Sequence, residues 1–118
     1  MKIKTIISLV LVLIMLFAFT VPSFAAWTTI NGKASNYLMA TRTCKFTNWG
    51  TDKVTVVNNG KTNMYVYVNG CFWREISPGR ECTYATYSQK IKVQVYAVNT
   101  RALGTQQFVI KTTSGTIY

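Results

Sequence analysis

Hydrophobic and polar residues alternate along much of the chain, most clearly at residues 90–98. There, four apolar residues at odd numbers, from Ile91 to Ala97, fall on one side of an extended chain, and the residues between them fall on the other. This spacing predicts an antiparallel strand with one buried and one solvated face. By contrast, Met64–Val68 is apolar or aromatic at every position, which predicts a strand in the middle of a sheet.

Turn residues separate the predicted strands. Two Asn-Gly pairs, at 59–60 and 69–70, stand between β-prone segments, and each favours a two-residue hairpin turn in which both residues have positive φ. The Ser-Pro-Gly-Arg segment at 77–80 predicts a type II turn. The expected strands cover residues 41–48, 53–58, 61–68, 71–76, 81–87, 90–98 and 105–112, with an edge strand around 27–30. Seven short strands joined by turns predict an all-β fold, a small antiparallel β-sandwich or barrel.

The first 25 residues have the pattern of a secretory signal peptide. Lys2 and Lys4 precede an apolar run at 6–19, and the Ser-Phe-Ala triplet at 23–25 has small residues where signal peptidase cuts. A transmembrane anchor is the alternative, but the run is shorter than the about 20 residues of a spanning helix, and Pro22 follows it. We therefore expect cleavage after residue 25 and a single secreted, extracellular β domain at 26–118.

Charge is the strongest signal in the composition. The chain has 13 Lys and Arg residues, three Asp and Glu residues and no His, for a net charge of +10; without Lys2 and Lys4 it is +8. Such an imbalance predicts association with polyanions. For an exported protein we expect anionic cell-wall polymers or a membrane surface as partners, and no nucleic acid. The alternative is that the charge only maintains solubility.

Cations and aromatic rings are interleaved on the solvated side of the strand at 90–98. Lys90, Lys92 and Tyr96 fall on that side, and Lys111 is expected elsewhere on the sheet faces. Tyrosine settles at the depth of lipid headgroups while lysine binds phosphate, so this combination suits an anionic interface. These four residues are the predicted envelope-binding residues. Ordinary exposed strand positions are the alternative explanation.

Three cysteines in an exported chain allow one disulfide and leave one thiol. If each predicted turn closes a hairpin, Cys71 and Cys82 lie about 13 Å apart along their strands, too far for a disulfide. If a four-residue turn at 49–52 also pairs the strands at 41–48 and 53–58, these registers place Cys44 at nearly the height of Cys82, and a sheet folded onto itself would bring the two together. We therefore predict a Cys44–Cys82 disulfide between two sheets, with Cys71 as a buried free thiol. A monomer is favoured, and a dimer joined through Cys71 is the alternative.

The inventory of side chains argues against catalysis. Without histidine, neither a Ser-His nor a Cys-His pair can form, and three scattered cysteines without C-x-x-C spacing do not make a zinc site. A glycosidase needs two carboxylates about 5–10 Å apart, whereas Glu75 and Glu81 are expected on opposite faces of adjacent strands. We expect a binding protein that is not an enzyme and has no metal or cofactor.

A second candidate site follows the turn at 69–70. Phe72, Trp73 and Arg74 have the composition of a protein–protein hot spot. The predicted register turns Trp73 toward the core and places Phe72 and Arg74 on the other face, beside Tyr65 and Tyr67. The Trp-Arg pair, followed by a Pro-Gly turn, is similar to that of microbial α-amylase inhibitors of the tendamistat type. The resemblance is short: the family's Trp-Arg-Tyr triplet is Trp73-Arg74-Glu75 here, and three cysteines cannot form the family's pair of disulfides. It implies an inhibitor as one interpretation.

The sequence as a whole predicts a secreted, cationic, non-enzymatic protein that binds anionic cell envelopes, as a bacteriocin-like antimicrobial or antifungal effector does. The first alternative is an inhibitor of an extracellular hydrolase that contacts the enzyme through Phe72–Arg74. The second alternative is a structural protein of a cell wall or matrix.

Overall fold

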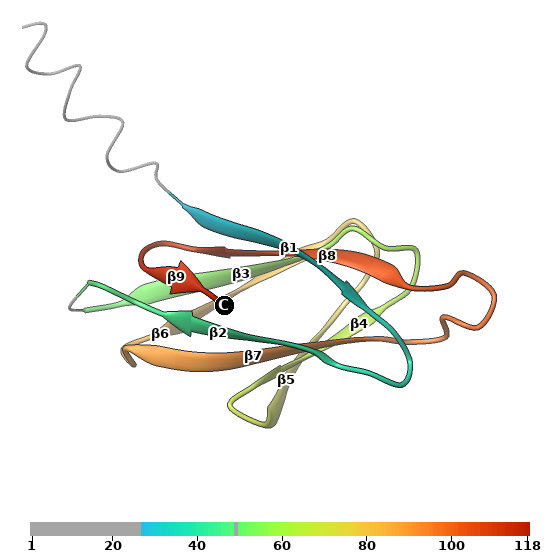
Figure 1. Ribbon diagram of the computed structural model, residues 1–118, viewed down its shortest axis with the longest axis horizontal. Coiled ribbons are helices and arrows are strands. Elements are labelled where there is room, and N and C mark those ends of the chain that lie inside the picture. The colour runs from blue at the N-terminus through green and yellow to red at the C-terminus, as the bar shows by residue number, and fades with distance from the viewer. Residues whose placement is uncertain (1–26, 49) are drawn as a thin grey trace, which may run out of the picture.

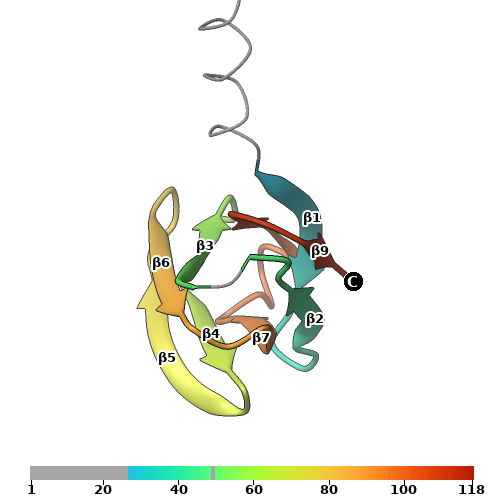
Figure 2. The ribbon, with the colours of Figure 1, turned by 90° about the vertical axis from the view of Figure 1, so that its left-hand side faces the viewer.

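The computed structural model describes residues 27–48 and 50–118, which form two antiparallel sheets packed face to face (Figures 1 and 2). The four-stranded sheet has the strand order β1-β8-β3-β6, and the five-stranded sheet has the order β5-β4-β7-β2-β9. The strands are β1 (Thr28–Ala34), β2 (Ala40–Lys45), β3 (Asp52–Asn58), β4 (Met64–Val68), β5 (Cys71–Ile76), β6 (Glu81–Thr86), β7 (Lys90–Ala97), β8 (Gln106–Thr112) and β9 (Thr116–Ile117). The predicted all-β sandwich is confirmed, and each predicted strand is present with its ends shifted by a few residues.

The predicted signal peptide lies outside the described residues. Within the described ranges, no helix has the length and apolar character needed to cross a membrane.

The strand pairs are nested one inside another. Strand β4 pairs with β5, β3 with β6, β2 with β7, and β1 with β8. In each antiparallel pair, the residue numbers of two opposite residues have a nearly constant sum. This sum is 135 in β2–β7, 138 in β3–β6, 139 or 140 in β4–β5 and 140 in β1–β8, so all four pairs are centred close to the same point of the chain. The chain is therefore one long hairpin with its tip at 69–70, wound until its arms form two packed sheets. This is the arrangement of a jelly roll.

The turn at 69–70 is a true hairpin turn. Asn69 has φ 52° and Gly70 has φ 83°, the positive values that a type I′ turn requires. It joins β4 to β5, with Val68 opposite Cys71 as predicted.

The other two predicted hairpins are wrong, because the chain changes sheets at both places. After β3, the fully buried Asn58 donates from its side-chain nitrogen to the carbonyls of Thr62 and Ile76, at 2.8 Å each. These bonds hold residues 59–63 as a crossing to β4 in the other sheet. At 77–80 the predicted turn itself forms, with φ 75° at Gly79 and a 3.0 Å hydrogen bond from the Arg80 amide to the Ser77 carbonyl. It too connects the two sheets.

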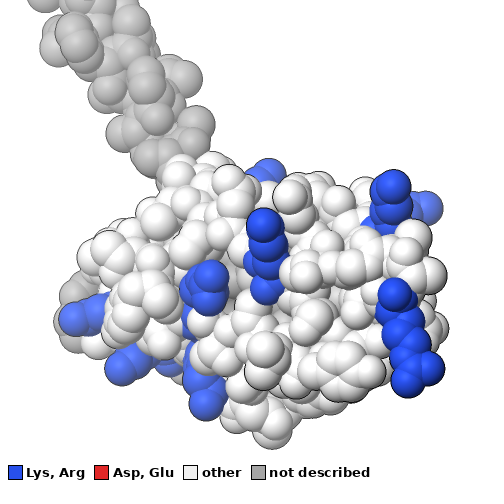
Figure 3. All heavy atoms as spheres, turned by 45° about the vertical axis from the view of Figure 1, so that its right-hand side comes forward, with Lys and Arg blue, Asp and Glu red and all other residues white. Residues whose placement is uncertain are grey.

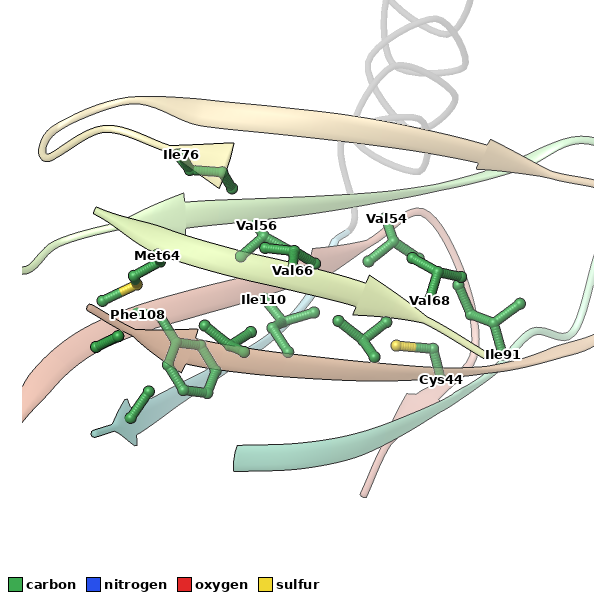
Figure 4. Packing of buried hydrophobic residues seen from close by; sticks show 14 of the residues in the cluster. Cys44, Val54, Val56, Met64, Val66, Val68, Ile76, Ile91, Phe108 and Ile110 are labelled. Atoms are coloured by element: carbon green, nitrogen blue, oxygen red, sulfur yellow. The ribbon is translucent and has the colours of Figure 1, made fainter. Parts of the chain in front are cut away.

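The core lies between the sheets and comes from the inward positions of both (Figure 4). The four alternating residues of β7 are all 1% exposed or less, which confirms the predicted buried face. Strand β4 lies between β5 and β7, so the predicted central position of Met64–Val68 is also confirmed. The fully buried side chains include Val54, Val56, Met64, Val66, Ile76, Ile91, Val93, Val95, Phe108 and Ile110.

The predicted Cys44–Cys82 disulfide is not formed, and all three cysteines are free thiols. Cys82 belongs to β6, an edge strand of the four-stranded sheet, whereas Cys44 belongs to β2, which contacts β1 at the opposite edge of the sandwich. The prediction failed because it paired β2 with β3 and β5 with β6, while β2 in fact pairs with β7 and β6 with β3. Cys71, expected to be buried, is exposed.

Candidate functional site

The outer face of the five-stranded sheet combines aromatic rings with lysines. We call this surface the aromatic–lysine face. It consists of outward-facing side chains on β4, β5, β7 and β2: Tyr65, Tyr67, Phe72, Tyr96, Lys90, Lys92 and Lys45. On β4 and β7 the face follows from alternation, because the residues between the outward ones point into the core.

Four rings form a continuous cluster across three strands. The ring centroid of Phe72 lies 5.7 Å from those of Tyr65 and Tyr67, with interplanar angles of 82° and 75°. Tyr65 is directly opposite Tyr96 on β7, and their centroids are 6.0 Å apart. The tyrosines are half-buried, and Phe72 is 57% exposed. The cluster therefore offers an apolar surface edged with hydroxyl groups.

The lysines lie on the same face, toward the start of β7. Lys90 is directly opposite Lys45 on β2, and Lys92 is opposite Thr43. Like charges directly opposite each other on neighbouring strands destabilise a sheet. Glu75, the acidic residue of this face, instead lies opposite Tyr65 and accepts a 3.0 Å hydrogen bond from Asn63. The Lys45–Lys90 pair thus places two like charges opposite each other, and Glu75 is paired elsewhere.

Basic side chains are also spread over other parts of the surface. Figure 3 shows several of them on the side in view, with no acidic side chain beside them. Lys111, predicted to act with Lys90, Lys92 and Tyr96, belongs to β8, where it is opposite Thr29 and Thr55 on the outer face of the four-stranded sheet. Lys90, Lys92 and Tyr96 therefore share the outer face of the five-stranded sheet, along the length of β7, whereas Lys111 lies on the other sheet. Sequence reasoning missed the pairing of Lys45 with Lys90, because no local signal predicts which strand lies beside β7.

A β-bulge divides the second predicted site. The β4–β5 register shifts between Val66 and Tyr67, so that Phe72 is opposite Tyr67 while Arg74 is opposite Val66. Trp73 packs against the core and meets Tyr84 of β6 edge-to-face, with the centroids 5.3 Å apart. Arg74 lies 6.0 Å above the Trp73 ring and not beside Tyr65 and Tyr67 as expected. The three residues therefore do not form one contact surface.

The outer face of the four-stranded sheet has a pocket of about 350 Å³. Its volume is at the small end of the range for ligand pockets, about 300–1,000 Å³. It is lined by Asn31, Gly32, Lys33, Asn59, Gln107, Phe108 and Val109. Its lining has no pair of acidic groups and no histidine or thiol.

Two titratable side chains, Asp52 and Cys44, are buried and contribute to the fold. One carboxylate oxygen of Asp52 accepts hydrogen bonds from the hydroxyls of Thr113, at 3.1 Å, and Ser114, at 2.8 Å, and so ties the β8–β9 connection to β3. Burial raises the pKa of the Cys44 thiol to about 11, which keeps it protonated and unreactive near neutral pH. Among residues 27–48 and 50–118, no three His, Cys, Asp or Glu side chains are grouped so that they could hold a metal ion.

Comparison with known proteins supports the fold. No family model matches the chain, and no curated protein sequence matches it significantly. Among solved structures, it is similar to the crystal structure of the Yersinia pseudotuberculosis-derived mitogen, with a TM-score of 0.51 over 76% of this chain and 86% of that one. The two sequences are 10% identical, so the likeness concerns the β-sandwich architecture alone.

Proposed function

We propose that this is a secreted, cationic, non-enzymatic protein that attaches to anionic polymers of cell envelopes through the aromatic–lysine face. The observation that carries the proposal is the Lys45–Lys90 pair next to Lys92 and the aromatic cluster. Residue choices that cost stability are expected at functional sites. A bound polyanion would remove the repulsion between the two lysines.

In the proposed binding mechanism, the lysines and the aromatic rings make different contributions. The lysines attract phosphate or carboxylate groups of the polymer, and an exposed ion pair contributes at most about 1 kcal/mol. Several such contacts along a repeating polymer are therefore needed. The rings of Tyr65, Tyr67, Phe72 and Tyr96 add apolar contact with sugar rings, and their hydroxyls keep hydrogen bonds to water or to the polymer. This action needs no catalytic group, metal or cofactor.

An antimicrobial or antifungal effect would follow from attachment to foreign cells. The basic domain, at +8 after loss of Lys2 and Lys4, would accumulate on an anionic envelope and crowd or displace its counterions. Attachment confined to the producing cell's own wall would instead indicate a structural role.

Inhibition of an extracellular hydrolase is the second candidate function. It is favoured by the exposed Phe72 ring and by the stacking of Arg74 on Trp73 at the free edge of the five-stranded sheet. An inhibitor would concentrate its affinity in these few side chains, so that Arg74→Ala would cost about 2 kcal/mol or more of binding energy.

The test is binding of the purified domain to whole bacterial and fungal cells at increasing salt, with two variants. Binding should fall steeply between 0.1 M and 1 M salt, because the Debye length shortens from about 10 Å to about 3 Å. Lys90→Glu with Lys92→Glu should weaken binding strongly, and Arg74→Ala should leave it nearly unchanged. If Arg74→Ala abolishes activity while the double lysine variant keeps it, the envelope proposal is wrong and inhibition takes its place.

A further inference from the structure

Two connections at one end of the sandwich expose large apolar side chains to solvent. They are the β1–β2 connection, residues 35–39, and the β7–β8 connection, residues 98–105, which lie at the same end of the molecule (Figure 1). We call them together the apolar tip. Its exposed side chains are Tyr37 (79% exposed), Leu38 (74%), Met39 (37%) and Leu103 (49%). Single exposed apolar residues are ordinary, but four on two joined loops mark an interaction site.

Hydrogen bonds hold the two loops together. The backbone amide of Asn36 donates to the Thr100 hydroxyl at 3.3 Å, and the backbone amide of Thr100 donates to the Asn36 side-chain oxygen at 3.1 Å. The buried Gln106 side chain donates to the carbonyls of Leu103 and Gly104, at 3.2 and 2.9 Å. Because these buried polar groups are paired with the loops, the outward position of Leu38 and Leu103 is built into the fold.

The charges around the apolar tip are basic. Arg101 belongs to the β7–β8 connection itself, and Lys33 stands near the end of β1, just before the β1–β2 connection. The acidic residues nearest this end, Glu75 and Glu81, belong to β5 and β6, the strands at the opposite edge of the sandwich from β1 and β2. An apolar tip flanked by cations is complementary to an anionic lipid surface, and the same cations would oppose packing against a second copy of this basic chain.

We propose that the apolar tip inserts into the interfacial region of an anionic phospholipid bilayer. Leu38, Met39 and Leu103 would enter the boundary between headgroups and acyl chains, and Tyr37 would lie at headgroup depth. Arg101 and Lys33 would contact lipid phosphates. The inference shares with the proposed function only the premise that the protein meets a cell envelope, and it assigns the lipid contact to a different surface from the aromatic–lysine face.

The test uses sedimentation of the mature chain with lipid vesicles. Vesicles of equal parts phosphatidylglycerol and phosphatidylcholine contain no wall polymer, and variants of the apolar tip leave the aromatic–lysine face unchanged, so a loss of partitioning in these variants reports on the tip. Leu38→Ser with Leu103→Ser should lower the partition coefficient about tenfold, because two apolar side chains no longer leave water. The matched control is Tyr87→Ser. Tyr87 is 83% exposed in the β6–β7 connection at the other end of the sandwich, and its loss should change partitioning less than twofold.

Two results would support the inference, and two others would overturn it. The double leucine variant should keep the thermal melting profile of the unsubstituted protein and its salt-sensitive binding to purified anionic wall polymer, which would separate the two surfaces. Arg101→Gln should weaken binding to the anionic vesicles while leaving weak binding to pure phosphatidylcholine unchanged. Equal partitioning of the double leucine variant and the unsubstituted chain would overturn the inference, as would concentration-dependent dimers that dissociate on the same substitutions. Neither result would bear on polymer binding by Lys90 and Lys92.

Discussion

The outer faces of the two sheets have the same charge and different chemistry. The face of the five-stranded sheet has Lys45, Lys90, Lys92 and Glu75, and the face of the four-stranded sheet has Lys33, Lys53, Lys111 and Glu81. On the four-stranded sheet each lysine is opposite a neutral residue: Lys33 opposite Gln107, Lys53 opposite Ala85, and Lys111 opposite Thr29 and Thr55. The four rings of the aromatic cluster belong to the other sheet.

The comparison shows that net charge alone does not distinguish a binding face. A solubility role for the charge would distribute lysines among neutral neighbours, as on the four-stranded sheet. Placing Lys45 against Lys90 beside an exposed aromatic cluster serves no such role. Matched variants of the two faces can show whether this difference affects stability and binding.

The largest effect is expected from removing the central aromatic pair of the five-stranded sheet. Tyr65→Ala with Tyr96→Ala removes two half-buried rings and their contacts with each other and with Phe72. We expect a loss of about 3 kcal/mol in the free energy of unfolding, measured by urea denaturation, together with weaker binding to cells. Tyr87→Ala, which removes an 83% exposed ring, is the control and should leave both quantities unchanged. An equally small effect for both variants would show that the cluster contributes nothing.

The next effect compares charge reversals on the two faces. Lys90→Glu with Lys92→Glu and Lys53→Glu with Lys111→Glu change the net charge by the same amount. We expect the first pair to lower the affinity for purified anionic wall polymer at least about tenfold, or 1.4 kcal/mol, and the second pair less than about threefold. Isothermal titration with purified anionic polymer would measure both. Equal losses would mean that net charge, and not the aromatic–lysine face, determines binding.

A smaller effect, of opposite sign for stability and for binding, is expected at Lys45. Lys45→Gln removes the like-charge contact with Lys90, so the free energy of unfolding should rise by about 0.3 kcal/mol. Affinity for the polymer should fall by about threefold, because one contact is lost. Lys53→Gln, opposite Ala85, provides the control and should stabilise the fold less. A Lys45→Gln variant that gains stability and keeps full affinity would show that the Lys45–Lys90 pair does not contribute to binding.

The smallest effect concerns the thiols of the five-stranded sheet. The exposed Cys71 should react with a disulfide reagent within the dead time of a native assay at pH 8, whereas Cys44 should react only on unfolding. Because burial raises the Cys44 pKa from 9.0 to about 11, its contribution to stability is complete below pH 9 and is lost as the pH rises from 9 toward 11. A Cys71→Ser variant isolates the buried thiol for this measurement. Rapid labelling of Cys44 in the folded protein would contradict its inward position on β2.

The strands were predictable because their signals are local. The alternation in β7 and the apolar run of β4 depend only on the spacing of neighbouring residues, and the positive φ values at Asn69 and Gly70 follow from residue type. For the same reason, Lys90, Lys92 and Tyr96 could be placed on one solvated face before any pairing was known. These features are determined by the sequence itself.

Only the tertiary structure decided which strands lie side by side. The Asn-Gly pair at 59–60 looks like the one at 69–70, yet buried Asn58 bonds to Thr62 and Ile76 and carries the chain into the other sheet. The chain also changes sheets between β2 and β3 and between β5 and β6, and together these crossings place β2 beside β7, Lys45 against Lys90, Lys111 on the other sheet, and Cys44 away from Cys82. The physical reason is that a strand with one apolar face can pair with any neighbour that covers it. The choice among neighbours is made by burying the inner faces of both sheets together, which no local segment encodes.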